Sequence, residues 1–177
     1  MTTGDCARWR HPAIDGSELD VDRYGANLRR VAEAFDETDT IVSMEFMPFS
    51  NIPTLRAGLE VVERAGHPNA GLMIDLWHLV RSGGTYEELA AVPLRLIKGV
   101  ELNDAAAEQI GTGLEDTILR RRLCGEGDFD VAGFVTTLRG MGYEGPWGLE
   151  ILSETYRRRP MAEAVRDAYV TTAKYLT

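Results

Sequence analysis

Cysteine is scarce in this chain: Cys6 and Cys124 are the only two in 177 residues. Two cysteines are too few for the disulfide scaffold of a small secreted protein. No apolar run approaches the ~20 residues that cross a bilayer, and residues 1–12 lack the apolar core of a secretory signal. Basic residues are also few, 19 Lys and Arg against 28 Asp and Glu, which gives a net charge of −9. We therefore expect a cytoplasmic protein that binds neither nucleic acid nor an anionic membrane.

The length suits one domain, and apolar (44%) and charged (27%) fractions are ordinary for a globular one. Residues 1–19 are polar, contain Gly4, Pro12 and Gly16, and show no strand pattern. We interpret residues 1–19 as a polar arm or loop and residues 20–177 as the folded domain.

Four short apolar runs recur along the chain, and each ends near an acidic residue. They are Thr40–Glu45, Gly71–Asp75, Leu96–Glu101 and Trp147–Glu150. Each run is followed by turn residues, as buried parallel strands are. Helical patterns lie before, between and after them, so the order predicts an α/β fold with about four parallel βα units.

The predicted helices cover Asp20–Phe35, Pro53–Ala65, Thr85–Ala91, Asp130–Gly140 and Met161–Leu176. The second of them follows the N-cap types Ser50 and Asn51 and stops at Gly66. The third opens with a possible capping box between Thr85 and Glu88. The first is expected to turn four side chains inward, Leu28, Val31, Ala32 and Phe35.

Four carboxylates stand at the carboxyl ends of the predicted strands: Glu45, Asp75, Glu101 and Glu150. Active sites of parallel α/β proteins are built at that edge. Four converging carboxylates repel one another in a cleft, and a hard divalent cation, Mn²⁺ or Mg²⁺, is the simplest way to offset the repulsion. The alternative is that each carboxylate caps the following helix or faces solvent.

Other polar side chains are predicted to reach the same edge. His78 follows Asp75 by three residues, so it lies over the pocket if the loop enters a helix, where it can touch substrate or act as acid or base. The alternative is a histidine packed in the first helical turn. Arg121 and Arg122, in the basic run 120–122, are placed to reach an anionic substrate, or else form a solvated helix end.

The chain resembles the C-terminal half of the xylose isomerase-like TIM barrels, the sugar phosphate isomerase and epimerase family, over residues 20–177. Five segments carry the resemblance: SMEFMP, GLMIDLWH, GVELNDA, RRLCGEGDFD and GYEGPWGLEIL. The resemblance implies one divalent metal on Glu45, Asp75 and Glu150, with Glu101 where the family usually has His. The 3-dehydroshikimate dehydratases are similar in having an oxygen ligand other than His at that position.

The resemblance also implies a chemistry, which is proton abstraction next to a carbonyl. Glu45 and Glu150 would face each other across the substrate as base and acid, and His78 would hold a substrate oxygen. The substrate would be a small sugar, polyol or hydroxy acid. Three hypotheses follow: an isomerase or epimerase, a lyase of the dehydratase type, or a non-catalytic half-barrel that needs a partner.

The number of βα units falls short of a complete barrel. A closed barrel has eight units in about 250 residues, whereas Thr40 to Thr177 holds four units in 138 residues. The sequence therefore predicts a partial barrel with open strand edges. We expect a homodimer or a partner chain to complete it.

Overall fold

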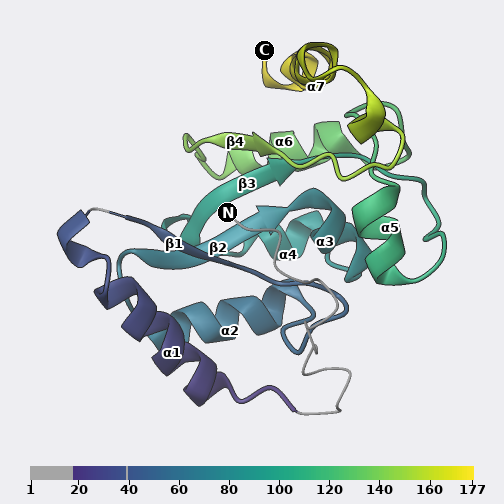
Figure 1. The fold of residues 1–177 in the computed structure, drawn as a ribbon. Helices are drawn as coiled ribbons and strands as arrows, with labels where there is room; N and C mark the ends of the chain where they lie inside the picture. Colours follow the sequence, from purple (N-terminus) through teal and green to yellow (C-terminus); the bar gives the residue numbers. More distant parts are fainter. Residues whose placement is uncertain (1–17, 39) are drawn as a thin grey trace.

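The computed structural model describes residues 18–38 and 40–177. The predicted arm, residues 1–19, lies outside the described residues except for its last two positions. Four strands form one sheet: β1 Val42–Glu45, β2 Ala70–Asp75, β3 Ile97–Leu102 and β4 Trp147–Leu149. They are parallel and lie in chain order (Figure 1). The α/β class and the partial barrel of four parallel units are confirmed, and each strand lies within two residues of its predicted bounds.

Helices precede, connect and follow the strands. They are α1 Val21–Glu33, α2 Leu55–Ala65, α3 Leu76–Arg81, α4 Tyr86–Ala90, α5 Gly113–Leu119, α6 Val131–Gly140 and α7 Met161–Leu176. Three short 3₁₀ turns join them: η3 Asp36–Thr38, η4 Leu94–Leu96 and η5 Tyr156–Arg158. No helix of residues 18–38 and 40–177 is both long and apolar enough to span a bilayer.

Capping side chains and a glycine define the ends of α2 and α4, and the predicted N-cap of α2 is wrong. Thr54, not Ser50 or Asn51, is the N-cap of α2, and its hydroxyl accepts the N–H of Ala57. Gly66 ends α2 with φ 58°, a left-handed conformation that glycine adopts without strain. The capping box before α4 is confirmed.

Two predictions for the first helix are wrong. Val31 and Phe35 are 47% and 42% exposed, although both were expected inside. The buried side of α1 follows Tyr24, Leu28 and Ala32, which pack toward α2 and the core. Val31 and Phe35 therefore face away from the core at the β1 side of the molecule.

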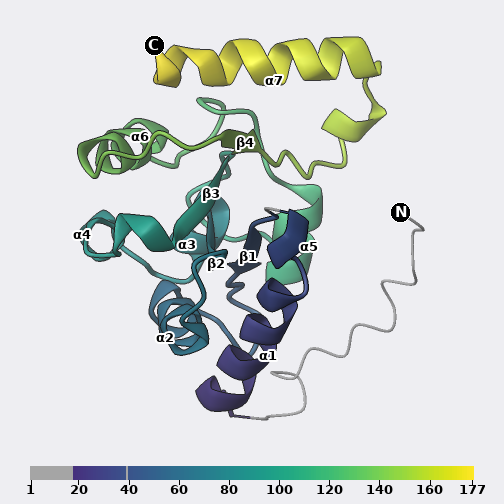
Figure 2. The ribbon, with the colours of Figure 1, turned by 90° about the vertical axis from the view of Figure 1, so that its left-hand side faces the viewer.

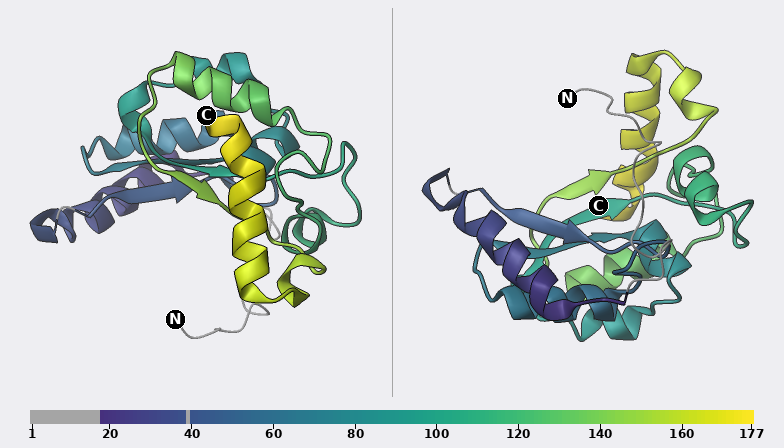
Figure 3. Two further views of the ribbon diagram at one scale, coloured as in Figure 1. Left: turned by 90° about the horizontal axis from the view of Figure 1, so that it is seen from above. Right: turned by 60° about the horizontal axis from the view of Figure 1, so that its bottom comes forward.

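The two faces of the sheet differ. Leu72, Ile74, Val100 and Leu102 are at most 1% exposed and pack against the helices. Figure 2 shows α7, α6, α4, α2 and α1 following one another in an arc around the strands, and this arc is open on one side. In the right-hand view of Figure 3, α1 and α2 lie below the strands and α7 stands beyond β4. The alternate side chains of the strands point to the face that the helices leave uncovered.

Candidate metal and active site

Four carboxylates meet at the carboxyl ends of the strands. Glu45 and Asp75 end β1 and β2, Glu101 lies near the end of β3, and Glu150 follows β4. Asp75 is in register with Glu101, which places both at the same level of the sheet. One oxygen from each of the four lies within 4.8 Å of the others. The structure thus brings together the four residues that the sequence singled out as metal ligands.

This convergence requires a curled sheet. β1 and β4 are the two outer strands, and neighbouring strands lie ~4.8 Å apart, so a flat sheet would separate their backbones by about 14 Å. Oxygens of Glu45 and Glu150 nevertheless lie within 4.8 Å of each other. The carboxylates therefore occupy the concave face, which we define as the face not covered by the helices.

Arg121 lies beneath the carboxylates as a fixed, buried cation. Its side chain is 1% exposed, and its Nη1 is 2.6 Å from Asp75 Oδ2 and 3.0 Å from Glu150 Oε2. The Thr117 hydroxyl accepts hydrogen bonds from Nε and Nη2, and the guanidinium lies 5.4 Å from the Trp77 ring centre. These contacts hold Arg121 against the carboxylates rather than in solvent.

Arg122 is not brought to the site. Its backbone pairs with Asp104, and its side chain is exposed and donates to the carbonyl of Glu126. Adjacent residues in an extended segment point to opposite sides. Of the two arginines predicted to bind substrate, only Arg121 faces the carboxylates.

Asp75 is held in place by three donors. Its Oδ1 accepts the backbone N–H of His78 and so caps α3, and its Oδ2 accepts from Arg121 and, at 2.8 Å, from Asn103 Nδ2. The sequence analysis missed Asn103 and Thr117. For Asn103 a signal was present, since it follows Glu101 by two residues and so shares its side of the chain.

His78 lies in the first turn of α3, over the site. Its Nε2 is 3.6 Å from Glu45 Oε1 and 3.3 Å from Arg121 Nη2. Burial lowers the pKa of His78 to about 4, so the ring is neutral at pH 7. Its Nδ1 is buried without a hydrogen-bond partner. The chain does enter helix α3 after Asp75. His78 therefore lies in the first turn of α3 and also next to the carboxylates.

The three glutamates of the cluster resist ionisation. Burial, assisted by the charges of the other three, raises the pKa of Glu45 to about 8. Burial and the charges of Glu150 and Asp75 raise the pKa of Glu101 to about 7. Burial also raises the pKa of Glu150, although Arg121 opposes the shift. When its members are ionised, the cluster therefore carries more negative charge than the single cation Arg121 offsets.

The donor set fits a divalent cation. Glu45 Oε1 is buried and has no hydrogen-bond partner, and one arginine faces four carboxylates. Oxygen-only ligands are those that Mg²⁺ and Mn²⁺ prefer. Glu45, Asp75 and His78 also satisfy the distance for a three-ligand set, but Nε2 of His78 already faces Arg121.

The cluster predicts how the metal-free protein responds to pH. Glu45 and Glu101 bind protons more tightly when folded, so unfolding releases protons and stability falls as pH rises toward 8. His78 has the opposite effect, but only below its ordinary pKa of 6.5. Thermal melts should therefore show a melting temperature that falls by a few degrees between pH 6.5 and pH 8. A loss of ~1 kcal/mol in unfolding free energy lowers the melting temperature of a protein of this size by ~2–4 °C.

Glu45→Gln provides the control for these melts, because it removes the most strongly shifted carboxyl. Its midpoint should depend less on pH across the same interval. A midpoint that is equally flat in the parent and in this variant would show that the carboxylates do not repel one another in the fold.

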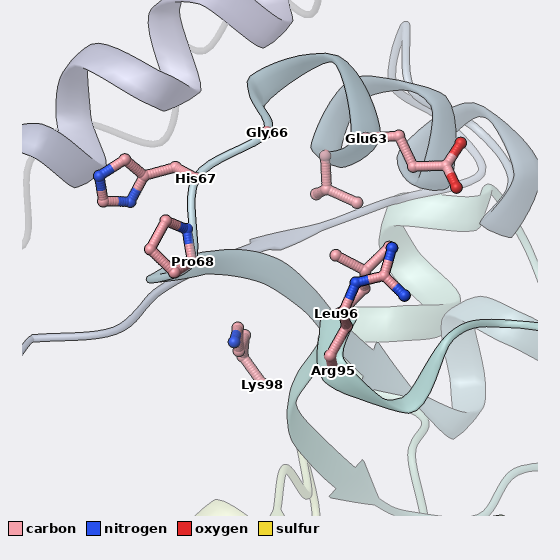
Figure 4. Close-up of a pocket in the computed structure, with 8 residues that line it drawn as sticks. Glu63, Gly66, His67, Pro68, Arg95, Leu96 and Lys98 are labelled. Atoms are coloured by element: carbon pink, nitrogen blue, oxygen red, sulfur yellow. The ribbon is translucent and has the colours of Figure 1, made fainter.

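A further cavity lies away from the carboxylates. Its volume is about 630 Å³, and it is lined by residues before β2, including His67, and by residues at the start of β3, including Arg95 and Lys98 (Figure 4). These are the amino ends of the strands, opposite the carboxylates. No member of the carboxylate cluster lines it.

Residues 4–172 match the family described as the xylose isomerase-like TIM barrel. The match begins inside the predicted arm, before residue 20. Among curated proteins, the 3-dehydroshikimate dehydratase of Pseudomonas putida is 26% identical over 163 residues, which are 92% of this chain and 25% of that protein. The inosose isomerase of Halalkalibacterium halodurans is 24% identical over 138 residues, 77% of this chain and 48% of that protein.

Solved structures share the fold. The IOLI protein with a bound zinc atom has a TM-score of 0.81 at 19% identity, over 90% of this chain and 59% of that one. D-psicose 3-epimerase in the presence of D-fructose has a TM-score of 0.69 at 15% identity, over 90% of this chain and 58% of that one. The chain thus spans between a quarter and about three fifths of these relatives.

Proposed function

Because the chain belongs to the xylose isomerase-like TIM barrel family, we propose that it carries the metal and acid–base groups of an isomerase or epimerase. The substrate is a small sugar, polyol or hydroxy acid with a carbonyl next to the reacting carbon. The observation that carries the proposal is the convergence of four carboxylates beside a neutral histidine on the concave face.

Glu45, Asp75, Glu101 and Glu150 are the proposed ligands of one divalent cation. When bound, such a cation polarises a substrate carbonyl and stabilises the negative charge of an enolate. The IOLI relative holds zinc. This chain offers only carboxylate oxygens in its four-membered set, which supports Mn²⁺ or Mg²⁺.

Glu45 and Glu150 are the proposed proton carriers. A general base works best when its pKa lies near the working pH, and the pKa of Glu45 is raised to about 8. One glutamate takes the proton from the carbon next to the carbonyl, and the other returns a proton to the same or the neighbouring carbon. Return to the opposite face of the same carbon gives an epimer. Return to the neighbouring carbon, with transfer of the hydroxyl proton from one substrate oxygen to the other, exchanges aldose and ketose.

His78 and Arg121 have supporting roles in this proposal. His78 is neutral, so its ring can hold a substrate hydroxyl or carbonyl oxygen without bringing charge. Arg121 orients Asp75 and Glu150, to which it is bound at 2.6 and 3.0 Å. Direct contact of Arg121 with an anionic substrate stays a prediction.

A dehydratase is the second candidate, and two observations favour it. The resemblance implies that Glu101 stands where the family usually has a histidine, and curated 3-dehydroshikimate dehydratases of Pseudomonas putida and Pseudomonas aeruginosa are 26% and 29% identical to this chain over the matched residues. The first step is the same proton abstraction. The reactions diverge only when a β-hydroxyl leaves as water instead of a proton being returned.

Solvent-hydrogen exchange tests the shared step for both candidates. The Mn²⁺-loaded protein in D₂O is given D-fructose, an inosose and 3-dehydroshikimate, and NMR follows deuterium at the carbon next to the carbonyl. We expect exchange with one of them, with an epimer or isomer as product, or with loss of water under the second candidate.

Glu45→Gln/Glu150→Gln should abolish this exchange, because neither remaining amide can carry the proton. Glu154→Gln is the matched control, since Glu154 is 55% exposed and pairs with Arg158 outside the cluster. Exchange that survives the double substitution would show that these glutamates are not the proton carriers.

A further inference from the structure

The cavity at the amino ends of β2 and β3 has no part in the proposed reaction. Its volume of about 630 Å³ lies within the ~300–1,000 Å³ of sites that bind small molecules. In Figure 4 the end of α2, with Glu63 and Gly66, forms one side of this cavity. Arg95 of η4 and Lys98 of β3 extend toward it from the other side. The cavity can therefore hold a small molecule between a helix end and two cations.

Arg95 and Lys98 have no partner in the part of the chain that the structure describes. Neither side chain makes a hydrogen bond or an ion pair with residues 18–38 or 40–177, although Glu63 lines the same cavity. Arg29, which reaches the same end of α2, differs because it donates to the carbonyl of Ala65. The cavity thus presents two uncompensated positive charges in a chain whose net charge is −9.

His67 lines the cavity but is not a third free cation. Its side chain is 7% exposed, and its Nε2 lies 3.3 Å from Asp36 Oδ1. Its Nδ1 accepts the backbone N–H of Asn69, so this nitrogen carries no proton. His67 therefore fixes the chain between α2 and β2, and the binding of an anion falls to Arg95 and Lys98.

The position of Lys98 depends on an irregularity in β3. The register with β2 shifts between Leu72 and Met73, where β3 contains one extra residue, Lys98. Such bulges redirect a side chain, and they are frequent next to functional sites. Gly71 leaves the space that the lysine uses, because a Cβ at this position would lie 2.4 Å from Lys98 Cγ. Lys98 thus reaches the cavity through two local departures from a regular sheet.

A second, smaller cavity shares the same two cations. Its volume is about 350 Å³, and Arg95 and Lys98 line it together with Ile41, Tyr143 and Glu144, among others. The two cations therefore lie between two cavities, each with apolar residues in its walls. An anionic group held by Arg95 and Lys98 would leave room beside it for an apolar or ring-shaped group.

We propose that Arg95 and Lys98 bind the phosphate group of a small phosphate monoester, whose organic part lies in the larger cavity. A phosphate monoester is largely doubly charged at neutral pH, which matches two cations, whereas a monocarboxylate carries one charge. A guanidinium binds phosphate through two parallel N–H bonds, and an ammonium binds it as a point charge. The apolar wall for the organic part consists of Val62, Pro68 and Leu96.

An NMR titration of the ¹⁵N-labelled chain without metal tests the proposal. Phenyl phosphate is the probe, and benzoate is the singly charged comparison at the same ionic strength. The backbone amides of Gly66 and Lys98 should shift and saturate with phenyl phosphate, whereas that of Asn103, beside the carboxylates, should not. Benzoate should bind about tenfold more weakly or less, because it makes fewer charge-assisted hydrogen bonds.

Arg95→Gln/Lys98→Gln should weaken phenyl phosphate binding by about tenfold or more, for the same reason. Arg166→Gln/Lys174→Gln is the matched control, because it removes the same charge from two exposed positions of α7. It should leave the affinity unchanged. Circular dichroism checks that the variants fold, and Arg95→Gln alone, at an exposed position, repeats the test if the double variant does not.

Three results would overturn the proposal. They are shifts that do not saturate or that fall on other amides, an equal loss of affinity in the two double variants, and benzoate binding as tight as that of phenyl phosphate. The titration contains neither a metal nor a substrate with a carbonyl, and the cavity includes none of the four carboxylates. The phosphate site and the proposed function can therefore fail separately.

Discussion

Arg121→Met is expected to lower the free energy of unfolding by about 3–5 kcal/mol, the usual cost of leaving one member of a buried ion pair alone. The guanidinium is 1% exposed and its partner Asp75 is 0% exposed, at 2.6 Å. Methionine fills part of the space but leaves the Asp75 carboxylate with fewer donors and next to three other acids. Urea unfolding at pH 7, without added metal, measures the loss.

Arg122→Met is the matched control for this substitution. Arg122 is the next residue, carries the same charge, and is exposed with one side-chain bond to the carbonyl of Glu126. A change within about 0.5 kcal/mol is expected, as for most surface substitutions. If the two substitutions lowered the free energy of unfolding equally, the result would contradict the central, buried position of Arg121.

Glu45→Gln is expected to change metal affinity and stability in opposite directions. Loss of a group that only orients a metal ligand typically weakens metal binding ~10–100-fold. Loss of the Glu45 carboxylate, a proposed direct ligand, should weaken Mn²⁺ binding by at least as much. The same substitution removes a charge from a crowded, buried cluster, so the metal-free protein should melt at a higher temperature at pH 8. Calorimetric titration and thermal melts measure the two effects on one preparation.

Glu154→Gln serves as the control here too, because it removes one carboxylate outside the cluster. Its Mn²⁺ affinity and its melting temperature at pH 8 should match those of the parent. Weaker binding in Glu45→Gln without any gain in metal-free stability would mean that the carboxylates do not repel one another as proposed.

Much of the site could be predicted because parallel strands end at a common edge. Each of the four acids stands at or next to the end of a short apolar run, and register then brings Asp75 level with Glu101. The spacing of three residues between Asp75 and His78 placed the histidine over the site on the condition that a helix follows Asp75, and the structure meets this condition because Asp75 caps α3. These inferences need only local patterns and a sheet that curls.

Features that depend on packing could not be predicted in the same way. Nothing in the run 120–122 tells which arginine turns inward, since that depends on the backbone pairing of Arg122 with Asp104. Val31 and Phe35 fit a helical stripe, yet they lie at the edge of the molecule where no described segment covers them. By contrast, α5 was missed although its capping box, Thr112 with Glu115, is visible in the sequence.

The direct test of the account is a Mn²⁺ titration of the parent chain at pH 8, followed by electron paramagnetic resonance of the free ion. At this pH Glu101 is ionised and Glu45, with its pKa at about 8, is ready to lose its proton to a bound cation. The account predicts saturable binding of one Mn²⁺ per chain, lost in Glu45→Gln and kept in Glu154→Gln. Absence of saturable binding, or equal binding in the parent and Glu45→Gln, would contradict a metal site built from the four carboxylates.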